Sequence, residues 1–268
     1  MVQRRSATGH DVKLSSRLEG KVAIVTGSGS GIGQGCALMF ARHGARVMGC
    51  DVNVRGAEET LATAREEGLA LESLHPTDLT LPADVDGLMA HTLRRYGGID
   101  ILVNAAAWCA FEFIEQLDYE RDWKRTLTGE LDIVFLACKA AWPHLKARGG
   151  GAIINFASVN SHMAHPVAGA LAHCAGKGGV LAMTRQLACE GGPHKIRANS
   201  ISPGMIVTGA TRPELEKPGY KDAILEAKMI KRLGAPEDIA WCATYLVSDE
   251  ATWVTGADFR VDGGATAW

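Results

Sequence analysis

A glycine-rich stretch near the start of the chain has the composition and spacing of a phosphate-binding turn. Its glycines fit the pattern G-x-x-x-G-x-G between the apolar run 22–25 and the helical pattern 37–41. Between a strand and a helix, glycines let the backbone approach a pyrophosphate, and the helix N-terminus adds free N–H groups and the positive end of its dipole. A flexible loop is the plainer alternative, but these flanks favour a dinucleotide site. The predicted contacts are Gly27, Ser30, Gly31, Ile32 and Gly33.

An acidic residue follows at the distance that such a site requires. The next apolar segment, 45–50, ends at Asp51. This is about twenty residues beyond the glycines, where a carboxylate accepts hydrogen bonds from the adenosine ribose hydroxyls. The same negative charge repels a ribose 2′-phosphate. An exposed aspartate that merely ends a strand is the alternative. We therefore expect NAD, in preference to NADP, as the cofactor.

The segments that must position these residues alternate between two sequence patterns, one typical of strands and one typical of helices. Short apolar runs typical of strands are separated by longer helical patterns, which favours a parallel sheet with helices on both faces. We therefore predict an α/β fold with a doubly wound parallel sheet of about seven strands. The predicted strands are 22–26, 45–50, 69–74, 100–104, 151–156, 196–201 and 258–261.

Composition limits the classes of protein to which the chain can belong. Its 268 residues are 47% hydrophobic, enough for one large core, so we expect a mobile tail at 1–17 and a single domain at 18–268. The net charge of −2 gives no reason to expect a nucleic acid or a membrane as partner. The seven cysteines form no C-x-x-C pair, which suggests reduced thiols and a cytoplasmic location.

Two later motifs indicate the same kind of protein. Residues 104–107 read N-A-A-A after an apolar segment, and residues 199–208 fit N-x-x-x-P-G-x-x-x-T. Together with the glycine-rich turn, they make the chain resemble the short-chain dehydrogenase/reductase family in its classical subtype, over about residues 18–264. The resemblance implies a Rossmann-type fold, a nicotinamide cofactor and a homotetramer.

The resemblance also implies further contacts with the cofactor. In this family an aspartate at the position of Asp78 contacts the adenine amino group, although a helix-capping role is an alternative for this residue. The motif around residues 203–208 fixes the nicotinamide, and a lysine holds its ribose. The cofactor contacts implied in this way are Asp78, Leu79, Asn104, Lys177, Pro203, Ile206 and Thr208.

The catalytic positions depart from the family pattern. Ser158 keeps the family's serine, which hydrogen-bonds the substrate oxygen, and Lys177 keeps the lysine. His173 stands where the family has its proton-exchanging tyrosine, and Glu130 stands where it usually has asparagine. An unperturbed histidine has a pKa of about 6.5, so a neutral imidazole is a competent base near pH 7. The substitution therefore favours alcohol oxidation over ketone reduction.

Several details of this constellation stay open in the sequence. An imidazole is shorter than a phenol, so His173 reaches the alcohol directly, after a small shift, or through a water molecule. Glu130 either pairs with Lys177, fixes the tautomer of His173, or is a solvated helix residue. His173 could also fill space in a protein that has lost redox chemistry. Tyr220 is the one tyrosine that could conceivably swing into the site.

The substrate pocket is less well defined. The segment 209–232, which contains two prolines and several charges, is predicted to cover the substrate. The pocket walls implied by the resemblance mix apolar surface with imidazoles, which suits a medium-sized alcohol with a polar or acidic group. A zinc site built from His162, His165, His173 and Glu130 is an alternative, but its spacing is a weak signal and we expect no metal. The predicted pocket walls are Trp108, His162, Met163, His165 and Met205.

These observations predict an NAD-dependent oxidoreductase that oxidises a secondary alcohol to a ketone, with His173 as general acid and base and Glu130 as an auxiliary group. One alternative is a lyase or isomerase that uses the same two residues beside a bound cofactor. The other is a catalytically silent NAD-binding sensor. Dehalogenating members of the family lose the dinucleotide loop, so the intact glycines argue against that activity.

Overall fold

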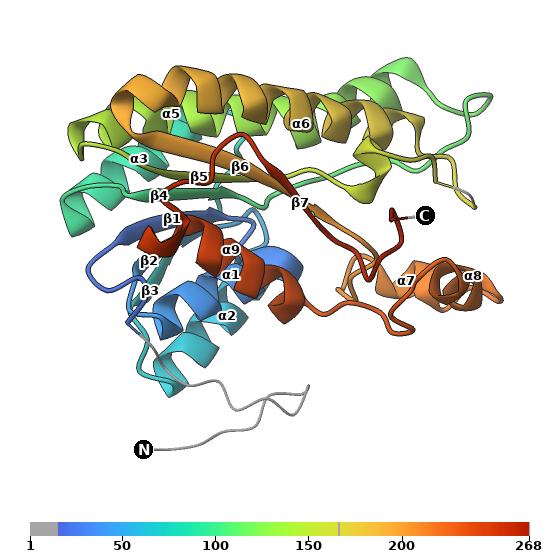
Figure 1. Ribbon diagram of the computed structural model, residues 1–268, viewed down its shortest axis with the longest axis horizontal. Coiled ribbons are helices and arrows are strands. Elements are labelled where there is room, and N and C mark those ends of the chain that lie inside the picture. The colour runs from blue at the N-terminus through green and yellow to red at the C-terminus, as the bar shows by residue number, and fades with distance from the viewer. Residues whose placement is uncertain (1–15, 166, 268) are drawn as a thin grey trace.

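The computed structural model describes residues 16–165 and 167–267, so the predicted tail at 1–17 lies almost wholly outside the described residues. The described chain forms one parallel sheet of seven strands in the order β3-β2-β1-β4-β5-β6-β7 (Figure 1). The predicted fold class is confirmed. The strands are β1 (Val22–Thr26), β2 (Arg46–Cys50), β3 (Leu71–Leu74), β4 (Ile101–Asn104), β5 (Gly151–Phe156), β6 (Ile196–Pro203) and β7 (Asp258–Val261).

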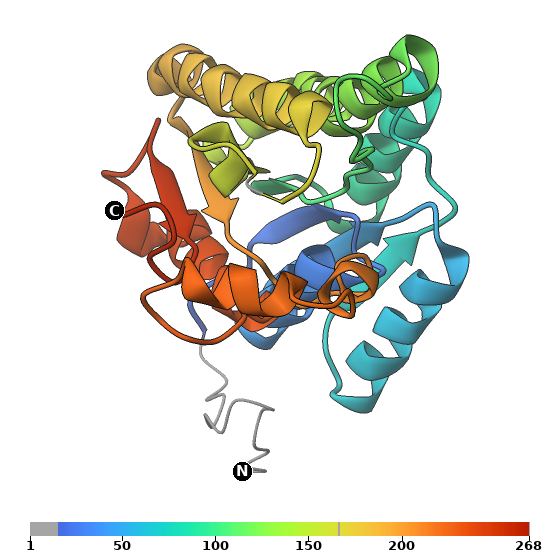
Figure 2. The same ribbon diagram turned by 90° about the vertical axis from the view of Figure 1, so that its right-hand side faces the viewer.

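Helices cover both faces of the sheet. In Figure 1, α3, α5 and α6 lie above the sheet, and α1, α2 and α9 lie below it. Figure 2 looks from the end of the molecule where α7 and α8 lie. Within the described ranges, no helix is both long enough and apolar enough to cross a membrane. The main helices are α1 (Gly31–Arg42), α2 (Val54–Glu66), α3 (Pro82–Tyr96), α4 (Arg125–Leu127), α5 (Ile133–Ala147), α6 (Leu171–Gly191), α7 (Arg212–Leu215), α8 (Tyr220–Glu226) and α9 (Pro236–Val247).

The central strands are buried on both faces, which explains why they read as unbroken apolar runs. In β1, Ala23 and Val25 belong to the core on one side of the sheet, and Ile24 belongs to the core on the other. In β4, Val103 belongs to the same core as Ala23 and Val25, and Leu102 belongs to the same core as Ile24. Successive side chains of a strand point to opposite faces, so only an apolar residue at every position suits a sheet covered on both sides.

Between β4 and β5, residues 119–147 form one continuous helical run whose winding changes three times. Two stretches, η1 (Tyr119–Lys124) and η2 (Thr128–Asp132), are wider π-helical turns on either side of α4. The run begins where the side chain of Asp118 accepts hydrogen bonds from the first free N–H groups. Glu130 lies in the second wide turn and is buried. Such turns are frequent at functional sites because they redirect a side chain within a helix.

Candidate active site

The turn between β1 and α1 is shaped so that only glycines fit. A Cβ added at Gly33 would lie 2.1 Å from the carbonyl oxygen of Gly27, and one at Gly27 would lie 2.8 Å from the Cα of Ala106. Ser30, the residue before α1, makes no side-chain capping hydrogen bond to the first turn of that helix. The N-terminus of α1 therefore suits an anion brought close to the backbone.

A cavity of about 860 Å³ opens beside this turn. Nine of the residues predicted to bind the cofactor line this cavity, together with small residues after β4 and the side chains of Lys124 and Arg125. The structure therefore brings together the glycine turn, the residues predicted to contact the adenosine of the cofactor, and the start of the covering segment. The nine residues are Gly27, Ser30, Gly31, Ile32, Gly33, Asp51, Asp78, Leu79 and Thr208.

Asp51 is held at the end of β2 by backbone donors. Its Oδ2 accepts a hydrogen bond from the N–H of Gly29 at 2.8 Å, and its Oδ1 accepts one from the N–H of Asn53 at 2.8 Å. These bonds fix the carboxylate beside the glycine turn and at the wall of the cavity. Its negative charge therefore faces the space next to the phosphate-binding turn.

Four predicted cofactor residues lie outside the lining of this cavity: Asn104, Lys177, Pro203 and Ile206. The Asn104 amide donates a hydrogen bond to Oδ1 of Asn155 at 2.8 Å, so its buried side chain joins β4 to β5. Pro203 ends β6, and Ile206 pairs its backbone with that of Gly234. The Asn104 side chain is therefore engaged within the sheet, and a contact of this residue with the cofactor stays a prediction.

Trp108 and Arg125 form a wall of the cavity that the sequence reasoning did not foresee. The guanidinium carbon of Arg125 lies 3.8 Å from the centre of the Trp108 ring, and both residues line the cofactor cavity. Trp108, which the resemblance makes a wall of the substrate pocket, lines this cavity, and its backbone N–H donates to the carbonyl of Gly129. No sequence signal joined the two residues, because they come from different segments.

A chain of three polar side chains lies where α6, η2 and the end of β5 meet. Nδ1 of His173 is 2.7 Å from Oε1 of Glu130, and Nε2 of His173 is 3.2 Å from Oγ of Ser158. The Glu130 side chain is 1% exposed and that of His173 is 12% exposed. The structure thus joins three of the four predicted catalytic residues directly.

The direction of these hydrogen bonds follows from what each group can donate. A carboxylate of Glu130 can only accept, so Nδ1 of a neutral His173 carries the proton and Nε2 is left as an acceptor. Ser158 Oγ accepts a hydrogen bond from the backbone N–H of Asn160 at 3.1 Å and can therefore donate its own proton to Nε2. The arrangement is that of a nucleophile or alcohol, a base and an acid that orients the base.

Lys177 lies beside this chain of residues. Its Nζ donates to the carbonyl oxygen of Phe156 at 3.0 Å and lies 3.8 Å from Oε1 of Glu130. Both alternatives for Glu130 are therefore realised together, since the carboxylate bonds His173 and also faces the lysine. A solvated position for Glu130 is excluded by its burial.

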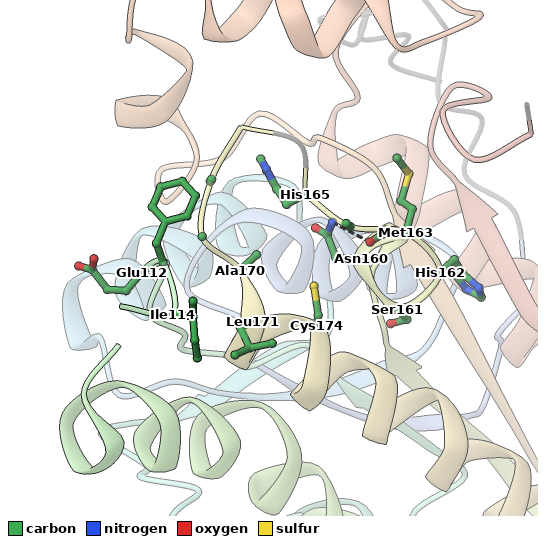
Figure 3. Close-up of a pocket in the computed structure, with 14 residues that line it drawn as sticks. Glu112, Ile114, Asn160, Ser161, His162, Met163, His165, Ala170, Leu171 and Cys174 are labelled. Atoms are coloured by element: carbon green, nitrogen blue, oxygen red, sulfur yellow. Dashed lines mark hydrogen bonds between the residues drawn. The ribbon is translucent and has the colours of Figure 1, made fainter. Parts of the chain in front are cut away.

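A second pocket, of about 660 Å³, lies under the loop that joins β5 to α6 (Figure 3). His162, Met163 and His165 of the predicted substrate wall line it, and the figure shows Cys174 of α6 below the same loop. Met205 is absent from the described lining of both pockets.

The two histidines of this loop have separate partners. Nε2 of His162 is 2.9 Å from Oδ2 of Asp258, and Nε2 of His165 is 3.2 Å from the hydroxyl of Tyr220. Partial burial lowers the pKa of His165, and the nearby His173 lowers it further. Tyr220 belongs to α8, so the covering segment is tied to the substrate loop at this point. The tyrosine is thereby held against His165.

A cysteine that the sequence analysis left unassigned lies beside the buried carboxylate. Burial raises the pKa of the half-buried Cys109 thiol to about 12, and the negative charge of Glu130 adds to this effect. Cys109 follows β4 by five residues and no spacing pattern marked it. It is brought to Glu130 because the segment after β4 packs against the wide turn η2.

Comparisons with known proteins show which family the chain resembles over most of its length. A family model described as enoyl-(acyl carrier protein) reductase matches residues 27–266. The chain is 36% identical over 255 residues to D-threitol dehydrogenase of Mycolicibacterium smegmatis, covering 95% of this chain and 96% of that one. It is 36% identical over 250 residues to the NAD-dependent glycerol dehydrogenase of Listeria innocua, covering 92% and 94%. A solved 7α-hydroxysteroid dehydrogenase complexed with NADH and 7-oxo glycochenodeoxycholic acid superposes with a TM-score of 0.88 at 30% identity, covering 93% and 96%.

Proposed function

Because the chain belongs to the short-chain dehydrogenase/reductase family and is an oxidoreductase, we propose that it oxidises a secondary alcohol with NAD, using His173 as the general base. The observation that carries this proposal is the chain of contacts from Glu130 through His173 to Ser158, at 2.7 Å and 3.2 Å. It supplies a proton acceptor at the position where the family places its tyrosine.

His173 accepts the proton of the alcohol at Nε2. The imidazolium that forms lies 2.7 Å from the buried carboxylate of Glu130, which stabilises its positive charge and keeps Nδ1 protonated throughout. Because the carboxylate sits in a region that water does not reach, its attraction for the imidazolium is stronger than it would be at the surface. General base catalysis of this kind contributes a factor of about 10² to 10⁴.

Ser158 and Lys177 position the reactants around this base. The hydroxyl of Ser158 lies next to Nε2 and hydrogen-bonds the substrate oxygen when the alcohol enters between them. The glycine turn, whose cradle a Cβ would fill, and the cavity beside it would hold the dinucleotide, with Lys177 at its ribose. When bound, NAD supplies the acceptor for the hydrogen of the substrate carbon.

Three arguments support the choice of cofactor and the class of substrate. The carboxylate of Asp51 disfavours a 2′-phosphate, so NAD is preferred to NADP. Two similar proteins are named for threitol and glycerol, which are polyhydroxylated alcohols. The second pocket carries Asn160 and His162, and Oδ1 of Asn160 and Nδ1 of His162 can bond the further hydroxyls of such a molecule, since only Nε2 of His162 is engaged with Asp258. We therefore assign a polyol as the substrate class.

The test is the absorbance of NADH formed from NAD and a panel of polyols and simple secondary alcohols between pH 5 and 9 in the native protein and in His173→Phe. His144→Phe, in the last turn of α5, is the matched control. We expect activity to fall by about 10²- to 10⁴-fold in His173→Phe alone. Equal activity of His173→Phe and the native enzyme would refute the assignment of the base. A product that forms without NADH would favour a lyase or isomerase.

We also propose that the enzyme is a cytoplasmic homotetramer. All seven cysteines are free, as a reducing compartment requires. Phe135 on α5 and Leu171 on α6 are exposed apolar side chains on the two helices that pair between subunits in the family. Light scattering coupled to gel filtration should give four times the mass of the chain, whereas the mass of a monomer would contradict the assembly.

A further inference from the structure

Three side chains of the types that can ligate a metal meet at the proposed active site, and one of them is the catalytic histidine itself. The ligand atoms of Cys109, Glu130 and His173 all lie within 4.8 Å of one another. The cysteine is kept there by the segment after β4, because the N–H of Trp108 donates to the carbonyl of Gly129 at 3.1 Å. The N–H of Ala110 makes a second such bond, to the hydroxyl of Thr126 at 3.0 Å. The group is therefore anchored on both sides of the thiol.

The combination of donors is selective for one class of ion. A thiolate, an imidazole nitrogen and a carboxylate oxygen are all zinc ligands, and a thiolate favours Zn²⁺ over Mg²⁺ or Ca²⁺. Zinc bonds of 2.0 to 2.3 Å in a tetrahedron place the ligand atoms about 3.3 to 3.8 Å apart. The group needs only to contract around the ion by about 1 Å, while the carboxylate withdraws slightly from the imidazole.

One oxygen of Glu130 has no hydrogen-bond partner among the described residues. Oε1 bonds His173, but Oε2 is buried and accepts no hydrogen bond. A buried acceptor without a donor costs free energy, and native proteins rarely leave one without a reason. A cation would satisfy this oxygen and would add the attraction of opposite charges in a buried site.

From this geometry we infer that Cys109, Glu130 and His173 form a binding site for Zn²⁺ and that the ion, by occupying the catalytic base, switches the dehydrogenase off. The inhibitory part of the inference rests on the proposed function of His173. The three protein ligands leave a fourth position for water. The ion thus competes for the same two side chains that the reaction needs.

The change on binding can be written so that its protons balance. The Cys109 thiol loses its proton to solvent as sulfur bonds the ion. His173 bonds the ion through Nδ1, and the proton of Nδ1 moves to Nε2, so the imidazole stays neutral. Nε2 then carries a hydrogen and donates to Ser158 in place of accepting. The histidine can no longer take a proton from an alcohol, so oxidation stops while the ion is bound.

The charge of Lys177 sets a limit on the affinity. Its ammonium lies 3.8 Å from Oε1 of Glu130 and repels a second cation. Phe156 holds Nζ in place, so the lysine does not simply swing away. We therefore expect reversible binding that a chelator removes, in contrast with the tight structural zinc sites of small domains.

The binding test uses Zn²⁺, and Cd²⁺ as a spectroscopic probe, on protein that a chelator has stripped of metal. We expect one ion per chain and an ultraviolet thiolate band with Cd²⁺. In Cys109→Ser the band should be lost and the affinity for Zn²⁺ should fall about tenfold or more. The control is Cys189→Ser, because Cys189 is an exposed cysteine of α6 that lines neither pocket and is not one of the three ligands. Equal affinity in Cys109→Ser and native protein would overturn the site.

The inhibition test follows NADH formation with and without Zn²⁺. Native enzyme and Cys189→Ser should lose activity as the ion binds and regain it with a chelator, whereas Cys109→Ser should keep its activity at the same concentration. Occupied sites with unchanged or increased activity would overturn the inhibitory role. If metal-free native protein oxidises no alcohol, the proposed function has failed, and the result of the binding test, which needs no substrate, still decides on the metal site.

Discussion

Gly176 lies directly against the carboxylate of Glu130. A Cβ added at Gly176 would come within 2.9 Å of Glu130 Oε2, which is closer than such atoms approach in proteins. The glycine is three residues beyond His173 in α6, so it faces the same wide turn of the neighbouring helix. The missing side chain is what allows the carboxylate to reach the histidine.

Gly176→Ala should therefore displace Glu130 and misalign His173. A misplacement of about 1 Å in a catalytic group can cost about 10²-fold in rate, so we expect kcat to fall by that order while the KM for NAD changes little. Gly178→Ala is the matched control, since a Cβ at Gly178 meets nothing within 4 Å. The two variants should be compared by steady-state kinetics. Similar kcat values in both would show that the contact is unimportant for alignment.

Glu130→Gln tests the role of the negative charge with little change in shape. An amide can donate its own proton to Nδ1 of His173, which places the imidazole proton on Nε2 and removes the acceptor for the alcohol. We expect a fall in kcat of about 10²- to 10⁴-fold in steady-state assays. Asp132→Asn, an exposed carboxylate two residues further along the same turn, should behave as native enzyme. Retention of full activity in Glu130→Gln would remove the carboxylate from the mechanism.

Asp51→Asn tests the choice between the two dinucleotides. The substitution removes the charge that repels a 2′-phosphate and keeps a similar shape beside the N–H of Gly29. We expect the ratio of kcat/KM for NAD to that for NADP to fall by at least about tenfold, which corresponds to 1.4 kcal/mol. Asp78→Asn is the control, because Asp78 also lines the cavity but is assigned to the adenine. An unchanged ratio would place the discrimination elsewhere.

The contact between His165 and Tyr220 should make the covering segment sensitive to acid. Burial lowers the pKa of His165 in the folded protein, so its neutral ring accepts a hydrogen bond from the tyrosine at neutral pH. The stabilisation is present above the unfolded pKa of about 6.5 and is lost as pH falls through the lower folded value. Glu214, whose charge opposes this shift, and His173, whose charge favours it, act on the same ring.

Hydrogen exchange of the amides in α8, corrected for the intrinsic effect of pH, measures this loss. Exchange in native protein should speed up between pH 7 and 5. Tyr220→Phe lacks the hydroxyl, so its exchange should be faster at pH 7 and nearly independent of pH. An α8 that exchanges at the same corrected rate across the range would mean that another contact holds the segment.

Much of the fold could be predicted from local patterns. Apolar runs such as 22–25 can be assigned as strands, because a strand in a sheet covered on both faces needs an apolar residue at every position. The glycines at 27 and 33 could be predicted as well, because they respond to sterics within a short stretch. Strand ends moved by one or two residues, as in β2, which begins at Arg46. Such shifts are usual because the ends depend on hydrogen bonds to neighbours.

The candidate site was predictable only where its residues fell on a motif. Ser158, His173 and Glu130 could be aligned in sequence, but whether the glutamate bonded the histidine or the lysine depended on the distance between two helices. Cys109 carried no signal, because its relation to Glu130 comes from packing between the segment after β4 and a turn of unusual width. Asn104 falls on a recognisable motif, but the motif could not show that its side chain bonds Asn155 in the neighbouring strand.

The strand order determines how the charged side chains are arranged along the cavity beside the glycine turn. Asp51 follows β2 and Asp78 lies after β3, the glycine turn follows β1 in the middle, and Arg125 stands over Trp108 beyond β4. Two carboxylates therefore line one end of the cavity, and the other end holds the Arg125 guanidinium beside the Glu120–Lys124 ion pair. An approaching dinucleotide, whose pyrophosphate is the anionic part, would be oriented by these charges before it touches the protein. Such steering acts over about 8 Å at physiological ionic strength, so added salt slows the entry of the cofactor more than it hastens its departure.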